Sequence, residues 1–226
     1  MDNVKKSFEE EAHQFDEIVR QLVPYYSEML DALVLALPFG TSRVIRVIDL
    51  GCGTGAVARH IKDSFPAAEI TCVDIAENML EMAKLKLSTG PSIRYQLADF
   101  RSYEFDEKYD AVVSSLALHH LEDEEKKPFY GKIFKSLNSG GIFYNADIIF
   151  GSDSHLQEQY MEKWKDFMRR HVPSDEIENK WIPRHYEEDR PTTLMAQLAW
   201  LEDIGFSEID VIWKYYNFAV YGGVRK

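Results

Sequence analysis

The residues with the strongest chemical signal form a glycine-rich turn. Gly51, Gly53 and Gly55 follow the β-rich run 44–50, and glycines at such a turn let the backbone bend sharply and approach a ligand without Cβ atoms in the way. Asp49 lies two residues before the first glycine, and Asp74 ends the next β-rich run. A glycine turn after a strand, followed about 20 residues later by a carboxylate, indicates a site for a cofactor that carries ribose hydroxyls.

Two kinds of cofactor are compatible with this turn. Gly51, Gly53 and Ala56 match the G-x-G-x-x-A fingerprint of dinucleotide sites, which leaves a nicotinamide-dependent oxidoreductase open. Asp49, however, suits a cofactor with an ammonium group and suits a pyrophosphate badly. The carboxylate therefore favours a cationic cofactor.

The run Asp49-x-Gly51-x-Gly53-x-Gly55 resembles motif I of the class I S-adenosyl-L-methionine-dependent methyltransferases. Segments 73–79 and 98–100 are similar to the two adenosine-binding segments of that class, and 114–121 resembles its motif IV region. The resemblance implies S-adenosyl-L-methionine as the cofactor. It implies cofactor contacts from the following residues: Asp49, Gly51, Cys52, Gly53, Gly55 and Ser115 at the methionine part, Asp74 at the ribose diol, and Ile75, Met79, Asp99 and Phe100 around the adenine.

A narrower resemblance lies in the first 30 residues. Segments 15–19 and 23–27 are similar to the amino-terminal part of the carboxy-S-adenosyl-L-methionine synthases, a branch that acts in tRNA wobble-uridine modification, and the match implies that Tyr26 closes over the methionine end. Two departures favour ordinary methyl transfer. Gly53 stands where the branch has serine, and Trp181 stands where it has the arginine that fixes the extra carboxylate, with Arg184 three residues out of register. A synthase-like enzyme and a non-catalytic S-adenosylmethionine-binding protein remain alternatives.

Methyl transfer from a sulfonium needs alignment, exclusion of water and, for a protonated acceptor, a base. His119 and Asp147 are weak candidates for a catalytic group; His120 is adjacent, and at most one of the two histidines is expected to face the cleft. No metal site is expected, because the nearby carboxylates 122–125 indicate the solvated start of a helix. The segment 151–190 is rich in aromatic residues and has ten acidic against seven basic side chains, which favours a small neutral or cationic acceptor.

The alternation of elements predicts how these groups are positioned. Strands are expected at 44–50, 70–73, 93–97, 111–114, 142–149, 209–213 and 218–224, with helical spacing of apolar residues between the first five. This predicts an α/β, doubly wound, seven-stranded, mostly parallel sheet with an antiparallel terminal pair. An amino-terminal helical cap is expected at 1–40, with one helix over 8–22. The methyltransferase domain is expected at 41–226, with a helical insertion at 151–191 after the fifth strand.

Composition limits the partners. The chain has 226 residues and a formal net charge of −12, which argues against broad contact with nucleic acid or anionic lipid. It contains no apolar run of membrane-spanning length, and its two cysteines fit a reducing compartment. We therefore expect a cytoplasmic enzyme with a small-molecule substrate and no direct nucleic-acid partner, and a homodimer stays open.

Overall fold

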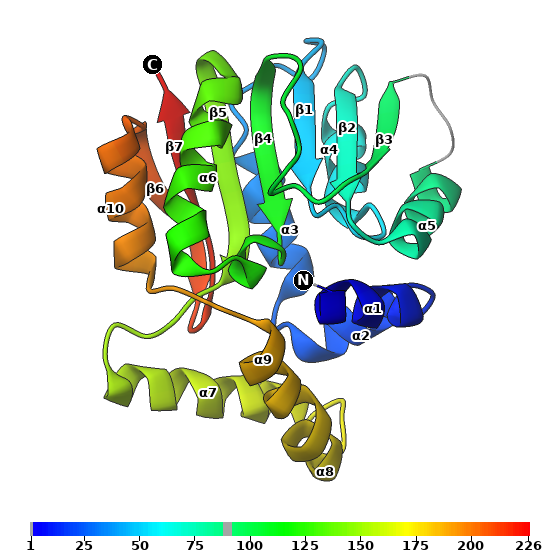
Figure 1. The fold of residues 1–226 in the computed structure, drawn as a ribbon, viewed down its shortest axis with the longest axis vertical. Coiled ribbons are helices and arrows are strands. Elements are labelled where there is room, and N and C mark those ends of the chain that lie inside the picture. The colour runs from blue at the N-terminus through cyan, green and yellow to red at the C-terminus, as the bar shows by residue number, and fades with distance from the viewer. Residues whose placement is uncertain (1, 88–91) are drawn as a thin grey trace.

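The computed structural model describes residues 2–87 and 92–226, which form a seven-stranded sheet between two layers of helices (Figure 1). The strand order is β3-β2-β1-β4-β5-β7-β6; β7 runs antiparallel to both of its neighbours, β5 and β6, and the other four pairs are parallel. The predicted fold class is confirmed, including the antiparallel terminal pair. The strands are β1 (Arg46–Leu50), β2 (Glu69–Asp74), β3 (Ile93–Leu97), β4 (Tyr109–Ser115), β5 (Leu137–Ile148), β6 (Ser207–Tyr215) and β7 (Phe218–Arg225).

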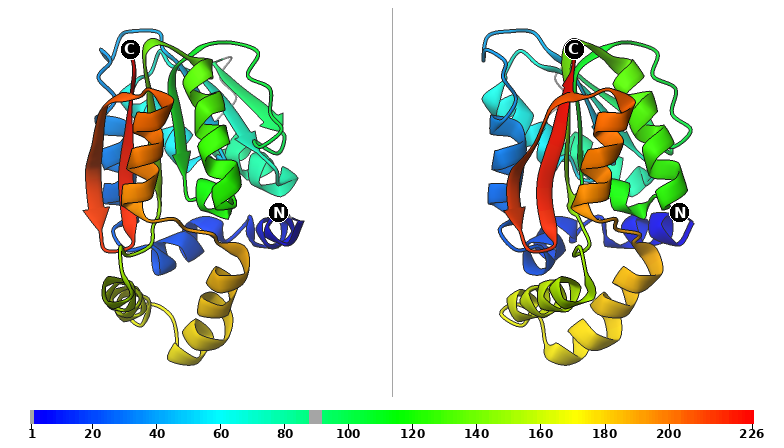
Figure 2. Two further views of the ribbon diagram at one scale, coloured as in Figure 1. Left: turned by 60° about the vertical axis from the view of Figure 1, so that its left-hand side comes forward. Right: turned by 90° about the vertical axis from the view of Figure 1, so that its left-hand side faces the viewer.

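Both faces of the sheet are covered because successive strand residues point to opposite sides. In β1, Val47 belongs to one apolar cluster and Ile48 to the other, and both are fully buried. Figure 2 shows the two helical layers edge on. One layer contains α3 (Tyr26–Leu35), α4 (Ala56–Ser64) and α5 (Glu77–Leu87); the other contains α6 (Asp123–Ser136) and α10 (Leu194–Ile204).

The remaining helices lie beyond the carboxyl ends of the parallel strands, at the bottom of Figure 1. They are α1 (Asp2–Glu11), α2 (Phe15–Leu22), α7 (Ser154–Met168), α8 (Ser174–Glu176), the π-helical turn η2 (Ile177–Trp181) and α9 (Ile182–Glu188), while the short 3-10 helix η1 (Leu118–His120) follows β4. Ligands of doubly wound sheets bind at this end. The amino-terminal helices and the insertion therefore cover the expected ligand site.

The prediction of one continuous helix over 8–22 is wrong. A turn at residues 12–14 separates α1 from α2. Ala12 is buried against Ala76 and Met79 at this turn, and the rings of Phe8 and Phe15 meet edge to face at 5.8 Å. The apolar residues of this stripe belong to two short helices, α1 and α2, which bend around the start of α5.

Hydrogen bonds join the two ends of this cover. Ser7 Oγ donates to Glu188 Oε1 at 2.8 Å, and Arg184 donates to Glu11 Oε2 at 2.7 Å. We call these four residues the latch. Trp164 Nε1 also donates to the carbonyl of Leu22 at 2.6 Å. The latch and the Trp164 bond connect the amino-terminal helices to the insertion.

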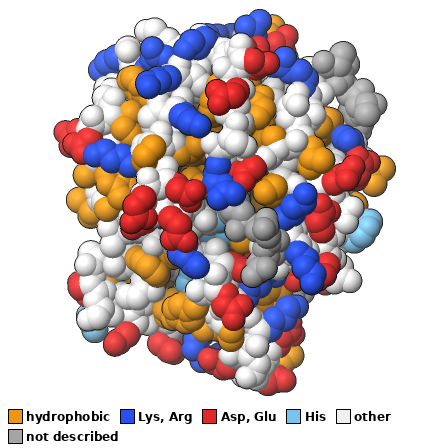
Figure 3. All heavy atoms as spheres, in the orientation of Figure 1, with side chains coloured by type: hydrophobic (Ala, Val, Ile, Leu, Met, Phe, Trp, Pro, Cys, Tyr) orange, Lys and Arg blue, Asp and Glu red, His pale blue; other side chains and the backbone are white. Residues whose placement is uncertain are grey.

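Acidic and basic side chains are interspersed over the face shown in Figure 3. Within residues 2–87 and 92–226, none of the helices combines the length and the apolar character that crossing a membrane requires.

Candidate active site

The first cavity lies against the glycine turn between β1 and α4. Gly51 and Gly53 have φ angles of +70° and +51°, a region that glycine adopts readily. A Cβ on Gly51 would lie 2.3 Å from Cβ of Ala117, so this position has no room for a side chain. The Gly53 N–H donates to Oδ2 of Asp74 at 2.7 Å, which fixes the turn to the end of β2. The cavity encloses about 670 Å³ of empty space, open solvent included.

Most of the predicted cofactor residues lie together around this cavity. Its walls include Tyr26, Gly51, Cys52, Gly53, Asp74, Ile75, Met79, Phe100 and Ser115. Their contacts with a cofactor stay a proposal, but the structure brings these nine side chains and turn residues to one place.

Asp49, Gly55 and Asp99 are not among the cavity's lining residues. Gly55 has a φ of +84°, and a Cβ there would approach Leu87 to 2.8 Å, so this glycine permits close packing of α4 on α5. The carboxylate of Asp99 is occupied by the Arg101 side chain at 2.6 and 2.9 Å. Asp49 is fully buried in β1, before the turn begins.

The first cavity has an acidic character. Burial raises the pKa of Asp74 to about 6, and burial together with the neighbouring Asp74 charge raises the pKa of Asp49 to about 8. Within the described part of the chain, no lysine or arginine lines this cavity, and Oγ of Ser115 is buried without a hydrogen-bond partner. These features fit a cofactor with a positive charge and hydrogen-bonding groups, and they fit a pyrophosphate poorly.

Sequence reasoning missed the role of Asp16. Its Oδ1 accepts a hydrogen bond from Thr54 Oγ1 at 2.5 Å, and its Oδ2 pairs with Lys86 Nζ. Asp16 therefore fastens α2 to the glycine turn. The resemblance at segment 15–19 was the available signal, but Thr54, the partner of Asp16, lies 38 residues away in the sequence.

A second cavity, with about 770 Å³ of empty space including open solvent, adjoins the first. It lies between α2, the insertion and η1. Aromatic walls come from Trp164, Trp181 and Phe218, and the charged lining residues are Glu11, Arg184, Glu188, Asp189 and His119. Phe8, Phe15, Leu116 and His120 line both cavities.

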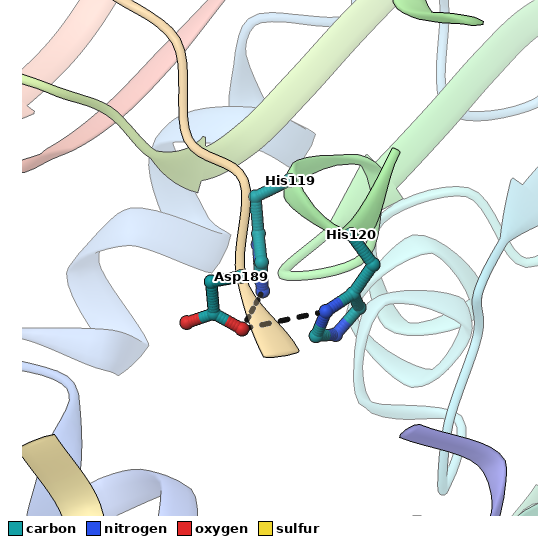
Figure 4. Close-up of side chains that lie close together, drawn as sticks. All are labelled: His119, His120 and Asp189. Atoms are coloured by element: carbon teal, nitrogen blue, oxygen red, sulfur yellow. Dashed lines mark ion pairs between the residues drawn. The ribbon is translucent and has the colours of Figure 1, made fainter. Parts of the chain in front are cut away.

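The turn after β4 aims two histidines at this region. Leu116 adopts a left-handed conformation with a φ of +52°, which is strained for a leucine, and η1 follows directly. In Figure 4, both imidazoles reach toward the carboxylate of Asp189. His119 Nε2 and His120 Nδ1 each lie 3.3 Å from Oδ1 of Asp189.

His119 is held between two carboxylates. Its Nδ1 lies 2.5 Å from Oδ1 of Asp147, and its backbone N–H donates to Oδ2 of Asp147 at 3.0 Å. Burial alone would lower the pKa of His119, but Asp147 and Asp189 outweigh burial and raise it to about 10. At neutral pH His119 is therefore an imidazolium. This protonation state makes His119 a poor proton acceptor, although His119 and Asp147 were the predicted catalytic candidates.

His120 has the opposite protonation. Burial and the positive charge of His119 lower the pKa of His120 to about 4. His119, His120 and Asp189 place nitrogen and oxygen atoms within 4.8 Å of one another, close enough to hold a metal ion. An imidazolium at His119 disfavours that use, and the prediction of no metal stays a prediction.

Comparisons with known proteins agree with this geometry. Residues 47–141 match the family model described as a methyltransferase domain. The carboxy-S-adenosyl-L-methionine synthase of a Nitratiruptor species is 28% identical over 231 residues, covering 99% of this chain and 95% of the relative. The synthase of a Helicobacter pylori strain is 27% identical over 235 residues, covering 96% and 93%.

Solved structures share the fold. The structure described as a DhpI-SAM-HEP complex has a TM-score of 0.66 at 18% identity, covering 98% of this chain and 95% of that one. Human N-acetylserotonin methyltransferase in complex with SAM has a TM-score of 0.63 at 20% identity, covering 96% and 56%.

Proposed function

We propose that this chain is a class I S-adenosyl-L-methionine-dependent methyltransferase and that it transfers the methyl group to a small neutral or cationic acceptor bound in the second cavity. The observation that supports this most directly is that the two cavities share four lining residues, Phe8, Phe15, Leu116 and His120. A cofactor against the glycine turn and an acceptor among the aromatic walls would meet at these side chains.

The first cavity suits the cofactor. S-adenosylmethionine, when bound, supplies a methyl group on a cationic sulfur together with an ammonium, a carboxylate and an adenosine. Asp74 would accept bonds from the ribose hydroxyls, and Ile75, Met79 and Phe100 would flank the adenine. Ser115 and Tyr26 would contact the methionine end. Asp49 and Asp74 would favour the positive charge, since a nearby cation stabilises a buried carboxylate.

The second cavity suits an uncharged or positively charged acceptor. The carboxylates of Glu11, Glu188 and Asp189 outnumber the cations Arg184 and His119 among its lining residues. Trp164 and Trp181 supply aromatic faces, which attract cations as well as apolar groups. An anionic acceptor would meet a surplus of negative charge.

The second candidate function is that of a carboxy-S-adenosyl-L-methionine synthase, which is the name of relatives aligned along almost the whole chain. Arg184 reaches the second cavity, one helical turn beyond Trp181. Its guanidinium, however, already pairs with Glu11 at 2.7 Å and Glu188 at 2.8 Å. Two carboxylates neutralise this arginine, so binding an extra carboxylate here would require displacing one of them. This arrangement favours methyl transfer.

The test is direct. Isothermal titration calorimetry should detect binding of S-adenosylmethionine and S-adenosylhomocysteine and no comparable binding of NAD. Competition with the carboxylated analogue should show no preference for that analogue. A screen of small amines, alcohols and thiols should then release S-adenosylhomocysteine with at least one acceptor. A clear preference for the carboxylated analogue would favour the synthase, and tight cofactor binding without any turnover would favour a sensor.

A further inference from the structure

His120 lies at the junction of the two cavities. Of the four side chains that line both cavities, Phe8, Phe15 and Leu116 are apolar, so His120 provides the polar side chain there. Its side chain is only 6% exposed. Any group that meets the acceptor where the two cavities join must therefore come from His120 or from these three apolar walls.

The hydrogen bonds of His120 define its tautomer. Nδ1 lies 3.1 Å from the carbonyl oxygen of Glu188 and 3.3 Å from Oδ1 of Asp189. Both are acceptors at neutral pH, so Nδ1 must carry the hydrogen. In a neutral imidazole the other nitrogen then has a free lone pair. Across the described segments, Nε2 of His120 is buried and has no hydrogen-bond partner.

We propose, building on the methyltransferase function above, that Nε2 of His120 is the catalytic base that takes the proton from the methyl acceptor. In this step the acceptor oxygen or sulfur forms a bond to the methyl carbon, the bond from that carbon to the sulfonium sulfur breaks, and its electron pair stays on the sulfonium sulfur. The acceptor's O–H or S–H proton moves to Nε2. Water entering between turnovers then removes that proton from the imidazolium.

A weakly basic imidazole is sufficient for this task. A hydroxyl or thiol becomes far more acidic as its new bond to carbon forms, so the base is needed late in the displacement. The pKa of about 4 keeps the lone pair free throughout the neutral range. After proton transfer, the Asp189 carboxylate beside Nδ1 stabilises the imidazolium.

His119, Asp147 and Asp189 are positioning residues in this scheme. The imidazolium of His119 lies beside the ring of His120, with ring centroids 4.1 Å apart. Its positive charge disfavours a second positive charge and so keeps the imidazole of His120 neutral. Across the second cavity, the charged groups that face this pair are Glu11, Arg184 and Glu188. They belong to the latch, in which two carboxylates pair with one guanidinium.

The first experiment compares acceptors with and without a transferable proton. The panel is 2-phenylethylamine, 2-phenylethanol, 2-phenylethanethiol and N,N-dimethyl-2-phenylethylamine, with S-adenosylmethionine at pH 8. His120→Asn should slow methylation of the alcohol and the thiol by about 10²- to 10⁴-fold, the usual contribution of a general base. The neutral form of either amine keeps its protons when it is methylated, so the rates of both amines should change by less than about threefold, a factor worth under 1 kcal/mol. His155→Asn, at an exposed site on α7, is the matched control.

Equal slowing of all four acceptors would overturn the proposal, because it would show that His120 only shapes the cavity. Loss of wild-type activity on chelation, restored by zinc, would also overturn it, since the histidine would then be a metal ligand. Calorimetry should give an S-adenosylmethionine affinity for His120→Asn within about threefold of wild type, as expected for a group that acts in the chemical step.

The second experiment requires no acceptor and separates this proposal from the proposed function. Nitrogen-15 NMR of histidine-labelled protein should show His120 as the neutral tautomer with the proton on Nδ1, and His119 as an imidazolium, from pH 5 to 8. The His120→Asn spectrum assigns the signal. A proton on Nε2 of His120 would refute the base assignment even if the protein methylated every member of the panel. If none is methylated while the tautomer is found, the proposed acceptor class fails and the base assignment stands.

Discussion

Asp49→Asn tests the electrostatics beneath the glycine turn. Asp49 is completely buried, and within the described residues neither of its carboxylate oxygens has a hydrogen-bond partner of good geometry. Burial and the nearby Asp74 raise its pKa from 3.8 to about 8, and the Ala58 amide offsets this only in part. Ionising this side chain in the folded protein is therefore costly.

The magnitude follows from proton linkage. A carboxyl whose pKa is higher in the folded state contributes stability that is fully present below pH 3.8 and is lost as the pH rises to about 8. Each pH unit within that window costs about 1.4 kcal/mol, so Asp49 should remove about 2 to 3 kcal/mol from the free energy of unfolding between pH 5 and pH 7. The asparagine variant lacks this loss. Its stability relative to wild type should therefore rise by that amount over the same interval.

Urea unfolding at pH 5, 6 and 7, followed by tryptophan fluorescence, measures this difference. Asp63→Asn is the control, because Asp63 is an exposed carboxylate on α4 whose removal relieves no desolvation cost. Wild-type and Asp49→Asn curves that stay parallel with pH would refute the reasoning. Calorimetry in buffers of different ionisation enthalpy gives a second measure: binding of S-adenosylmethionine at pH 7 should release part of a proton from wild type and less from the variant.

Four further substitutions test other contacts of the structure. Asp74→Ala should weaken S-adenosylmethionine binding by about 1.5 to 3 kcal/mol in calorimetry, because it removes a charged acceptor from the cavity and from the Gly53 N–H; unchanged affinity in a folded variant would exclude Asp74 from the site. Glu11→Gln leaves Arg184 with one carboxylate partner, so competition binding should shift toward the carboxylated analogue by about tenfold, the effect of one charge-assisted bond; no shift would mean that Arg184 does not face the ligand. Gly131→Ala in α6 should raise the free energy of unfolding by about 0.5 to 1 kcal/mol, since its Cβ would meet nothing within 4 Å. Gly222→Ala should lower it by more than about 4 kcal/mol, or prevent folding, since its Cβ would lie 1.8 Å from the Phe143 carbonyl; urea unfolding separates the two glycines, and equal effects would contradict the packing of β5 on β7.

The sequence was sufficient to predict the sheet because the local sequence patterns of its strands and turns agree with the overall fold. Buried strands leave β-rich runs, and the glycine turn requires residues without a Cβ, so both can be recognised without tertiary information. The strand at 93–97 matches β3 at both ends, and nine of the predicted cofactor residues surround one cavity. The turn at 12–14 was missed because an apolar stripe does not record a bend between two short helices.

The choice between the two histidines could not be made from sequence. It depends on the left-handed backbone at Leu116 and on Asp189, which comes from the far end of the insertion. The position of Arg184 was misleading for a different reason. Three residues out of register is a mismatch in an alignment, but on a helix residues i and i+3 lie on the same face, so Arg184 and Trp181 both line the second cavity.

The position of α1 has a practical consequence for handling the protein. Val4 and Phe8 of this first helix form part of the wall of the first cavity, and Glu9 accepts hydrogen bonds from the backbone N–H groups of Glu77 and Asn78. The carboxyl terminus, in contrast, leaves β7 at the opposite end of the sheet (Figure 1). A purification tag fused ahead of α1 would lie close to the wall of the first cavity. The same tag placed after Lys226 would lie far from that cavity during binding measurements.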